Sequence, residues 1–447
     1  MTLGPSEREA LLRAAHAVLD RNWTGRSTVA SRSLYPHQWS WDAAFIAVGR
    51  SHREQHKAQQ ELESLFAGQW ASGMVPHIVF NAAIPDDAYF PGPGFWKAEP
   101  TDGGVHTSGI TQPPLHARAA LEIWHNATDK AEARAFLERM YPKLVASHWY
   151  LARRRDVGGR GLAVIVHPWE SGLDNSPLWD PDLDHLVIPP GALPPYQRYD
   201  LVHAQAADRP SDEAYDRFVY LAAAYRDSGY DDFHLRGTFP FLIEAPLFNS
   251  IWCWSAHALA GIAEILGEDP APHLAMGRRI AAGMRERLWD PAAGRFLGWD
   301  ARLGRRIDRR TVESLIPLLD PELPADAVDA IRRELASPHF RPEPLGGTRY
   351  VVPSYDLRGP GFDRRRYWRG PIWMNTNWLI WRGLGQHGGG AARAEVARSM
   401  AALVARSGFR EYFDPFTGDG YGSHEFSWTA ALLIDLLEGD LEGDARA

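Results

Sequence analysis

The chain has 447 residues, of which 45% are hydrophobic and 23% charged, and its formal net charge is −8 at pH 7. These values are ordinary for a soluble globular protein. The negative charge and the absence of any five-residue basic run exclude nucleic acid and anionic membranes as default partners, so we expect a small-molecule ligand.

Helical patterns run through the whole chain, separated by loops rich in glycine, proline and aromatic residues. The first predicted helix opens with a capping box of Ser6 and Glu9 and has an apolar face up to Leu19. Strand-like alternation is scarce, and its best examples are Leu162–Val166 and Tyr350–Val352. Further helices are predicted at 41–50, 54–70, 113–127, 130–153, 212–227, 246–266, 273–288, 324–336, 371–384, 390–406 and 426–437.

These predicted helices are of two kinds. Those at 212–227 and 390–406 carry charges on one face, which indicates outer helices. Those at 246–266, 371–384 and 426–437 are apolar nearly all round, which indicates burial on every side. Two concentric rings of helices account for both kinds, so the sequence predicts an all-α fold.

The segment 155–211 is the longest predicted loop and is rich in proline, aspartate and aromatic residues. Loops of this length inside a compact domain are usually functional or disordered, and the aromatic and carboxylate content of this one favours function. We therefore predict one domain over residues 1–447, with 155–211 as an active-site insertion, in preference to two domains.

Cysteine usage and targeting signals bear on the compartment. Cys253 is the only cysteine, and its apolar neighbours indicate a small buried side chain. Since the N-terminus also lacks a signal-peptide pattern, a cytoplasmic protein is expected.

The uncharged stretch Ala245–Ala263 contains several polar residues, which predicts a buried helix and no membrane span. The 18 histidines form no motif such as H-E-x-x-H, so no metal or other cofactor is expected.

Aromatic residues are abundant, with 18 Trp, 15 Tyr and 18 Phe. Their flat faces suit the C–H faces of sugars, although large side chains also fill a large core. Many of these rings stand beside polar residues in loops, which favours a sugar site.

Glycoside cleavage needs two carboxyl groups on opposite sides of the bond. Asp174 comes two residues after Gly172 and lies between two tryptophans, Trp169 and Trp179. Their rings would desolvate the carboxyl group and raise its pKa, as a general acid requires. The structural alternative is an Asx-turn or a helix cap. Glu411 is the candidate base; its alternative is a solvated surface residue, and Glu425, expected in the first turn of the last helix, is its rival.

Four segments together resemble glycoside hydrolase family 63, and the segment 170–175 also resembles the trehalases of family 37. The four occur in the family's order along the chain and span residues 35–428, and each is moderately specific by itself. In the family they are the general-acid loop, the general-base segment and two sugar-binding loops. The matching residues here are 170–175 (ESGLDN), 410–418 (REYFDPFTG) followed by 426–428 (FSW), 35–42 (YPHQWSWD) and 367–373 (YWRGPIW).

Within that family the chain looks most similar to small bacterial enzymes that hydrolyse mannosylglycerate or glucosylglycerate, through residues 74–80, 107–114 and 209–215 as well. The resemblance implies that Arg209 and Tyr215 hold the glycerate carboxylate. From local sequence alone, these two would be a surface arginine and a core tyrosine. These enzymes carry a glutamine immediately before the final Ser-Trp, where this chain has Phe426.

The resemblance implies an (α/α)6 barrel with long active-site loops and an inverting mechanism. Asp174 would protonate the leaving oxygen while Glu411 activates a water molecule, releasing glucose or mannose from an α-linked acidic aglycone. The residues expected to bind the sugar are Tyr35, Trp39, Trp41, Asp42, His77, Gln112, Trp368 and Trp373.

Three other functions stay open at this point. An α-glucosidase or trehalase acting on a neutral disaccharide would use the same carboxylates. A sugar epimerase or isomerase on the same barrel would recruit histidines such as His167, His203 or His257. A sugar-binding protein without catalysis would not need both carboxylates. The sequence leaves glucose against mannose, the aglycone and the oligomeric state undecided.

Overall fold

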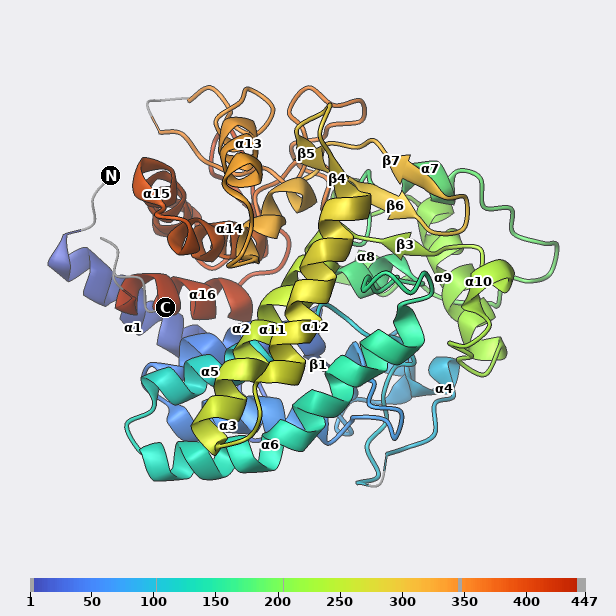
Figure 1. Cartoon of the computed structure of the whole chain (residues 1–447), viewed down its shortest axis with the longest axis horizontal. Helices are drawn as coiled ribbons and strands as arrows, with labels where there is room; N and C mark the ends of the chain where they lie inside the picture. Colours follow the sequence, from blue (N-terminus) through green and yellow to red (C-terminus); the bar gives the residue numbers. More distant parts are fainter. Residues whose placement is uncertain (1–3, 102, 204, 345–347, 440–447) are drawn as a thin grey trace.

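The computed structural model describes residues 4–101, 103–203, 205–344 and 348–439, and its centre is a closed ring of helices (Figure 1). Within these residues six elements pack side by side, each against the next and the last against the first. In ring order they are α2 (Ser40–Ser51), α5 (His116–Asn126), α11 (Pro246–Leu266), the 3₁₀ helix η6 (Val312–Leu319), α14 (Met374–Gln386) and α16 (Ser427–Glu438).

A second layer of helices covers this ring from outside. Each outer helix packs on an inner element, and α6, for example, lies against both α5 and α11. The outer helices are α1 (Pro5–Asn22), α3 (Gln55–Phe66), α6 (Lys130–Tyr150), α12 (Ala271–Gly283), α13 (Ala325–Leu335) and α15 (Gly390–Ser407). The fold is therefore the (α/α)6 barrel that the resemblance implied.

The burial of the helices follows their sequence patterns. The apolar helices α11, α14 and α16 are buried on nearly every face, as expected for the inner ring. The inner element η6 escaped prediction because its eight residues, with Pro317 among them, are too short for a helical repeat. The prediction for 212–227 was wrong in one respect: α9 (Asp212–Asp227) packs on α4 (Pro93–Trp96), outside both rings.

The start of α1 also differs from the expectation. The helix begins at Pro5 with Gly4 as its N-cap, so Ser6 lies inside the first turn and does not cap. Glu7 accepts the Gly4 amide at 2.8 Å instead of Glu9 closing a capping box. Proline suits this first position because it has no amide hydrogen to leave unpaired.

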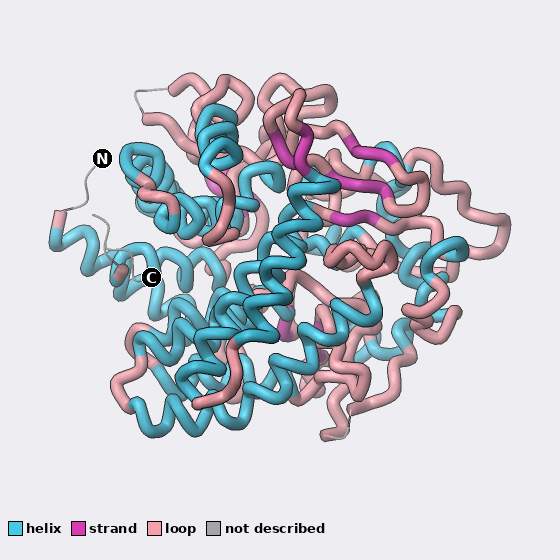
Figure 2. The backbone as a smooth tube through the Cα atoms, viewed as in Figure 1, coloured by secondary structure: helices cyan, strands magenta, loops and turns pink. Residues whose placement is uncertain are grey.

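Strands are few and short, and they gather beside the barrel (Figure 2). Neither predicted strand forms in full: within Leu162–Val166 only Ile165 pairs, in an antiparallel bridge with Ile243. The backbone of Ala163 is bonded by the Asn249 amide group, and Asn377 bonds both the N–H and the C=O of Val352. At these two residues a helix side chain takes the place of a strand partner. The strands are β1 (Gln38–Trp39), β2 (Ile78–Val79), β3 (Ile243–Glu244), β4 (Trp289–Asp290), β5 (Arg295–Phe296), β6 (Gly298–Asp300), β7 (Arg305–Ile307), β8 (Tyr412–Phe413) and β9 (Gly420–Tyr421).

The remaining helical turns lie in connecting loops, many of them in the segment 155–211 and next to it. They are η1 (Asp86–Ala88), η2 (Leu151–Arg155), η3 (Pro168–Ser171), α7 (Asp180–Leu183), α8 (Asp200–His203), η4 (Ala206–Asp208), α10 (Leu235–Thr238) and η5 (Met284–Leu288). No helix within the described residues is both long and apolar enough to cross a lipid bilayer, and the stretch Ala245–Ala263 falls almost wholly in α11.

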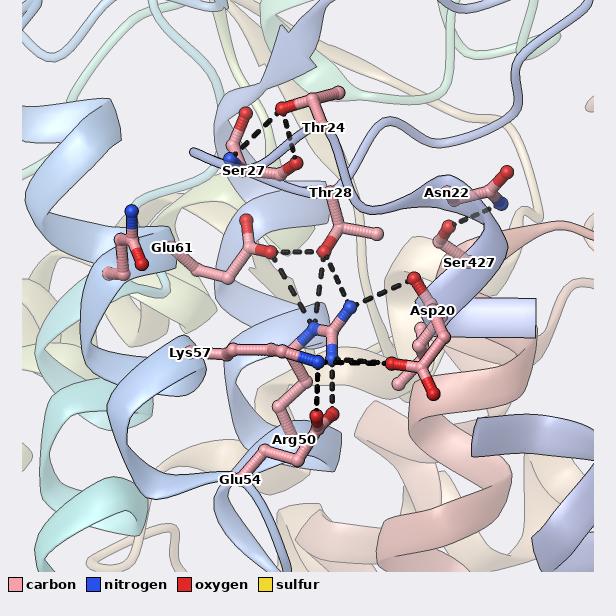
Figure 3. A network of polar contacts seen from close by, with 12 residues as sticks. Asp20, Asn22, Thr24, Ser27, Thr28, Arg50, Glu54, Lys57, Glu61 and Ser427 are labelled. Atoms are coloured by element: carbon pink, nitrogen blue, oxygen red, sulfur yellow. Dashed lines mark hydrogen bonds and ion pairs between the residues drawn. The ribbon is translucent and has the colours of Figure 1, made fainter. Parts of the chain in front are cut away.

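A buried charge network fastens α1, α2 and α3 together (Figure 3). Arg50, fully buried near the end of α2, donates to Thr28 and to the Leu19 carbonyl and pairs with Glu54. Glu61 of α3 accepts from Thr28 and lies 3.7 Å from Arg50. Its backbone carbonyl accepts from Gln38, the residue before Trp39, so this network also anchors the first aromatic loop.

Candidate active site

One cavity collects residues from the N-terminal ends of the inner helices. Trp39, Trp41 and Asp42 lie at the start of α2, and Phe426 and Trp428 at the start of α16. Because these helices run in the same direction, side chains far apart in sequence meet at one mouth of the barrel. The wall also contains Tyr35, His77, Tyr89, Phe90, Gln112, Trp169, Gly172, Asp174, Asp200, Arg209, Tyr215, Phe218, Tyr367, Trp368 and Glu411.

Glu411 is held by donors on both carboxylate oxygens. The Tyr35 hydroxyl donates to Oε1 at 2.7 Å, and the Ser423 amide donates to Oε2 at 2.8 Å. Arg209 Nη2 lies 3.3 Å from the same Oε2. These three donors fix the position of the carboxylate, and a general base must be held in place in this way.

Gly422 supplies the room for this carboxylate. A Cβ atom at this residue would lie 2.3 Å from Glu411 Oε2, and its φ of +66° is left-handed. Glycine is therefore required here by both space and backbone conformation.

Asp174 lies on the opposite loop, fixed by close packing. Gly172, two residues earlier, has a φ of +73°, and a Cβ atom there would lie 2.4 Å from the Trp41 ring. Trp179 Nε1 donates to the Leu173 carbonyl at 2.8 Å, which closes the loop from the other side. The glycine is therefore what lets this loop lie directly against the first aromatic loop.

The environment of Asp174 suits a proton donor. The pKa of its carboxyl group is raised to about 7, chiefly by burial; Arg209 opposes this shift, and the charges of Glu411 and Asp200 contribute to it. A group with this pKa is substantially protonated near neutrality, whereas an ordinary aspartate is not. Asp174 thus has the protonation state that a general acid needs.

A buried ion pair beneath the acid loop was not foreseen from the sequence. Arg155 and Glu170 are both fully buried and form two parallel hydrogen bonds of 2.8 and 2.9 Å. Glu170 also accepts the amides of Val166 and Thr111, so it ties the loop to the segment before α5. Arg155 ends a run of three arginines, and nothing in the sequence marks it as the buried one.

Asp42 is the second unusual carboxyl group of the cavity. Burial raises its pKa to about 8, and the charges of Glu411 and Asp174 add to the shift. It lies in the first turn of α2, where the Trp41 amide donates to Gln112 Oε1 at 3.3 Å. Asp42 and Gln112 are therefore adjacent polar groups at one end of the cavity.

Of the histidines considered from the sequence, only His77 lies in the described cavity wall. His77 lines the cavity, parallel to the Trp169 ring, and burial lowers its pKa to about 3, so the ring is neutral. His167 is outside the wall, and its two nitrogens bond the Phe218 carbonyl and the Trp169 amide. His257 lies at the other end of the barrel, and the side chain of His203 lies outside the described residues. A histidine acid–base pair for an isomerase is therefore absent from the described wall.

Trp373 is the predicted sugar-binding residue that the cavity wall does not include. It stacks behind Trp368 with ring centroids 3.8 Å apart, and its Nε1 donates to the Tyr367 carbonyl at 2.9 Å. Trp373 therefore supports Trp368 from behind, because the residue before α14 turns its side chain into the core. The other predicted site residues all lie in the wall.

Arg209 lies between the base and the outer part of the cavity. It is 3% exposed, its Nη1 donates to Tyr35 at 2.8 Å, and its Nε has no hydrogen-bond partner among the described residues. Tyr215 lines the same cavity and packs against Tyr196 and Arg198. Phe426 meets the Tyr35 ring edge to face. An apolar ring therefore occupies the position where the similar glycerate-releasing enzymes carry a glutamine.

Some residues of the cavity wall were not predicted, and Glu425, the alternative candidate for the general base, was assigned to the wrong part of the structure. Tyr89, Asp200 and Tyr367 join the wall from loops whose sequence gives no sign of which side chains face inward. Glu425 precedes the N-cap of α16, is half exposed and pairs with Arg21, so it is not in the first helical turn as predicted. Its carboxylate is not part of the cavity wall.

Comparison with known proteins gives matches along nearly the whole chain. The family model described as "Mannosylglycerate hydrolase MGH1-like glycoside hydrolase domain" matches residues 35–429. A mannosylglycerate hydrolase of Rubrobacter radiotolerans is 43% identical, over 96% of this chain and 98% of its own length. A glucosylglycerate hydrolase of Mycolicibacterium hassiacum is 38% identical, over 97% and 99%.

A solved structure gives the same result for the fold. The crystal structure of a GH63 mannosylglycerate hydrolase from Thermus thermophilus, in complex with Tris and D-glycerate, superimposes with a TM-score of 0.88. It is 39% identical and covers 95% of this chain and 99% of the other. The similarity thus includes both the barrel and the loops at its mouth.

Proposed function

Since the chain belongs to the mannosylglycerate hydrolase MGH1-like glycoside hydrolases of family 63, we propose that it hydrolyses an α-linked glycosyl-glycerate, either glucosylglycerate or mannosylglycerate, with inversion at the anomeric carbon. The observation that carries this proposal is the pairing of Asp174, whose pKa is raised to about 7, with Glu411, whose oxygens accept three donors, across one aromatic cavity. The names of the relatives support the glycerate aglycone.

In the proposed reaction, Asp174 donates its proton to the glycosidic oxygen as the bond from this oxygen to C1 breaks. Glu411 accepts a proton from a water molecule whose oxygen forms the new bond to C1 from the opposite face. The products are the free sugar with inverted configuration and the aglycone with a hydroxyl group. Proton exchange with solvent then returns both carboxyl groups to their starting states.

The sugar ring would lie among Trp39, Trp41 and Trp368, whose faces suit its C–H surfaces. Asp42 and Gln112 would bond its hydroxyl groups, and the hydroxyl protons would satisfy the buried Asp42 oxygens. Arg209 and Tyr215 would receive the aglycone carboxylate, for which the unpartnered Nε of Arg209 is a free donor. Phe426 adds an apolar surface beside Tyr35.

The test is to incubate the protein separately with glucosylglycerate, mannosylglycerate, trehalose and kojibiose, and to follow the anomeric protons by NMR from the first minute. We expect cleavage of a glycerate glycoside with the β-anomer appearing first. The Asp174→Asn variant, purified identically, controls for a contaminating glycosidase. Cleavage of only a neutral disaccharide would refute the glycerate assignment, and an α-anomer appearing first would refute the role of Glu411.

A cytoplasmic location and a single domain remain predictions of the sequence.

A further inference from the structure

Three side chains with metal-binding atoms meet on the side of the barrel away from the active site. Cys253 and His257 lie one turn apart on α11, and Asp320 follows directly after η6. One ligand atom from each lies within 4.8 Å of the other two. The outer helix α12 packs beside α11 (Figure 1). Cys253 faces α12, since its thiol donates to the Gly277 carbonyl at 3.4 Å.

Two of these groups have buried atoms without a hydrogen-bond partner. His257 Nε2 and Asp320 Oδ2 are both shielded from solvent and have no hydrogen-bond partner among the described residues, and Asp320 is only 1% exposed. Asp320 Oδ1 accepts the Glu322 amide, while Oδ2 has an ion pair of 3.5 Å with Arg285 but no hydrogen bond. A buried carboxylate oxygen that lacks a hydrogen bond is costly, so a ligand bonded to it would stabilise the fold.

Space for the imidazole is built into α12. Gly277 faces His257, and a Cβ atom there would lie 2.8 Å from His257 Nε2. Any larger residue would push the ring away from Cys253 and Asp320. The missing side chain therefore lets the three ligand atoms converge.

We propose that Cys253, His257 and Asp320 form a binding site for a divalent cation of the zinc class. Thiolate sulfur, imidazole nitrogen and carboxylate oxygen are the ligands that zinc takes in proteins, and a water molecule would complete a tetrahedral set. The nearby charges are mixed: Arg285 lies against Asp320, and the Glu322 carboxylate pairs with Arg278.

The site has an entry path, because His257 and Pro321 line a hollow at the end of the barrel where the inner helices finish, opposite the active-site cavity. Binding would form a metal–sulfur bond, break the S–H bond and release one proton to the buffer.

Cobalt(II) is the decisive probe, because Cys253 is the only cysteine in the chain. A thiolate-to-cobalt charge-transfer band in the near ultraviolet can arise only from this sulfur. We expect metal-free protein to develop this band with one cobalt ion per chain, to release one proton, and to lose the band when zinc displaces cobalt. Absence of the band at saturating cobalt would overturn the proposal.

The variants locate the site. His257→Gln, at a half-buried position, should weaken cobalt binding at least tenfold, whereas His125→Gln, which replaces another histidine of the same hollow, should not. Equal weakening in both variants, or none in either, would refute the assignment. Gly277→Ala keeps all three ligands and the helix while displacing the imidazole, and it should also weaken binding. A zinc-dependent rise of the melting temperature in the wild type but not in His257→Gln would provide a readout independent of turnover.

Discussion

The Tyr35 hydroxyl donates a hydrogen bond of 2.7 Å to Oε1 of Glu411, although 376 residues separate them along the chain. Tyr35 belongs to the loop before α2 and Glu411 to the segment before α16, and the closure of the barrel brings these two helices together. The same hydroxyl accepts from Arg209 at 2.8 Å, so one oxygen atom connects the proposed base with the proposed aglycone site. The first prediction tests this connection.

Tyr35→Phe keeps the aromatic ring and removes only the hydroxyl group. A hydrogen bond to a charged group is worth about 1.5–3 kcal/mol, so kcat should fall roughly 10- to 100-fold. KM should change little, because the ring still packs against Trp39. Steady-state kinetics on the preferred glycoside measures the split, and a change confined to KM would contradict the positioning role.

Glu411→Gln should remove base catalysis and lower kcat by about 10²–10⁴-fold while the melting temperature stays close to that of the wild type. Glu425→Gln is the matched control, since this nearby carboxylate pairs with Arg21 at the surface. Kinetics and thermal unfolding are measured for both variants. Wild-type activity in Glu411→Gln together with loss in Glu425→Gln would reverse the assignment.

Asp174→Asn should abolish acid catalysis for glycosides that need a protonated leaving group, but spare a glycosyl fluoride, whose leaving group needs little protonation. A fall of about 10²–10⁴-fold on the natural glycoside is expected, against less than about tenfold on the fluoride. Similar losses on both substrates would indicate a structural role.

The pH dependence follows from the same residue. Burial raises the pKa of Asp174 to about 7, and its active form is protonated, so kcat/KM should decline as the pH rises through about 7. This alkaline limb should be weak or absent with the fluoride. A limb of equal size on both substrates would assign the titration to another group.

Substitutions of Arg209 and Tyr215 should distinguish two roles: contact with the base Glu411 and binding of the aglycone carboxylate. Arg209→Gln removes a contact with Glu411, so it should lower kcat on any substrate and also raise KM for an acidic aglycone. Tyr215→Phe should raise KM for the glycerate glycoside alone, by roughly 3- to 10-fold for one hydrogen bond. Kinetics on a glycerate glycoside and a neutral disaccharide compare the two, and an equal effect of Tyr215→Phe on both substrates would exclude the carboxylate contact.

Asp42→Asn should stabilise the free protein while destroying activity. Burial raises the folded-state pKa of Asp42 to about 8, so the stability that its neutral form confers is fully present below about pH 4, declines above it and is lost as the pH rises through 8. An amide does not ionise, so the variant's advantage should be small near pH 4 and reach the order of a few kcal/mol near pH 8. Thermal unfolding across this range measures it, and a constant difference at all pH values would contradict the linkage.

The sequence determined the architecture because periodicity is a local property. Helices such as α9 and α11 have the bounds that their patterns predicted, since apolar spacing and proline at a helix start are visible along the chain. The loop carrying Asp174 and the segment carrying Glu411 stood out by composition for the same reason. The failures were also local, as at Ser6 and at η6, where a neighbouring proline or a short length left no usable pattern.

Only the tertiary structure decided which side chains act together. It separated Trp368, in the cavity wall, from Trp373 behind it, although both belong to one motif. It joined Arg155 to Glu170 beneath the acid loop, and it brought Asp320, which follows η6, to Cys253 and His257 on the adjacent helix α11. The physical reason is that burial, pKa and ligand geometry depend on distances between residues far apart in the chain, and closure of the barrel sets these distances.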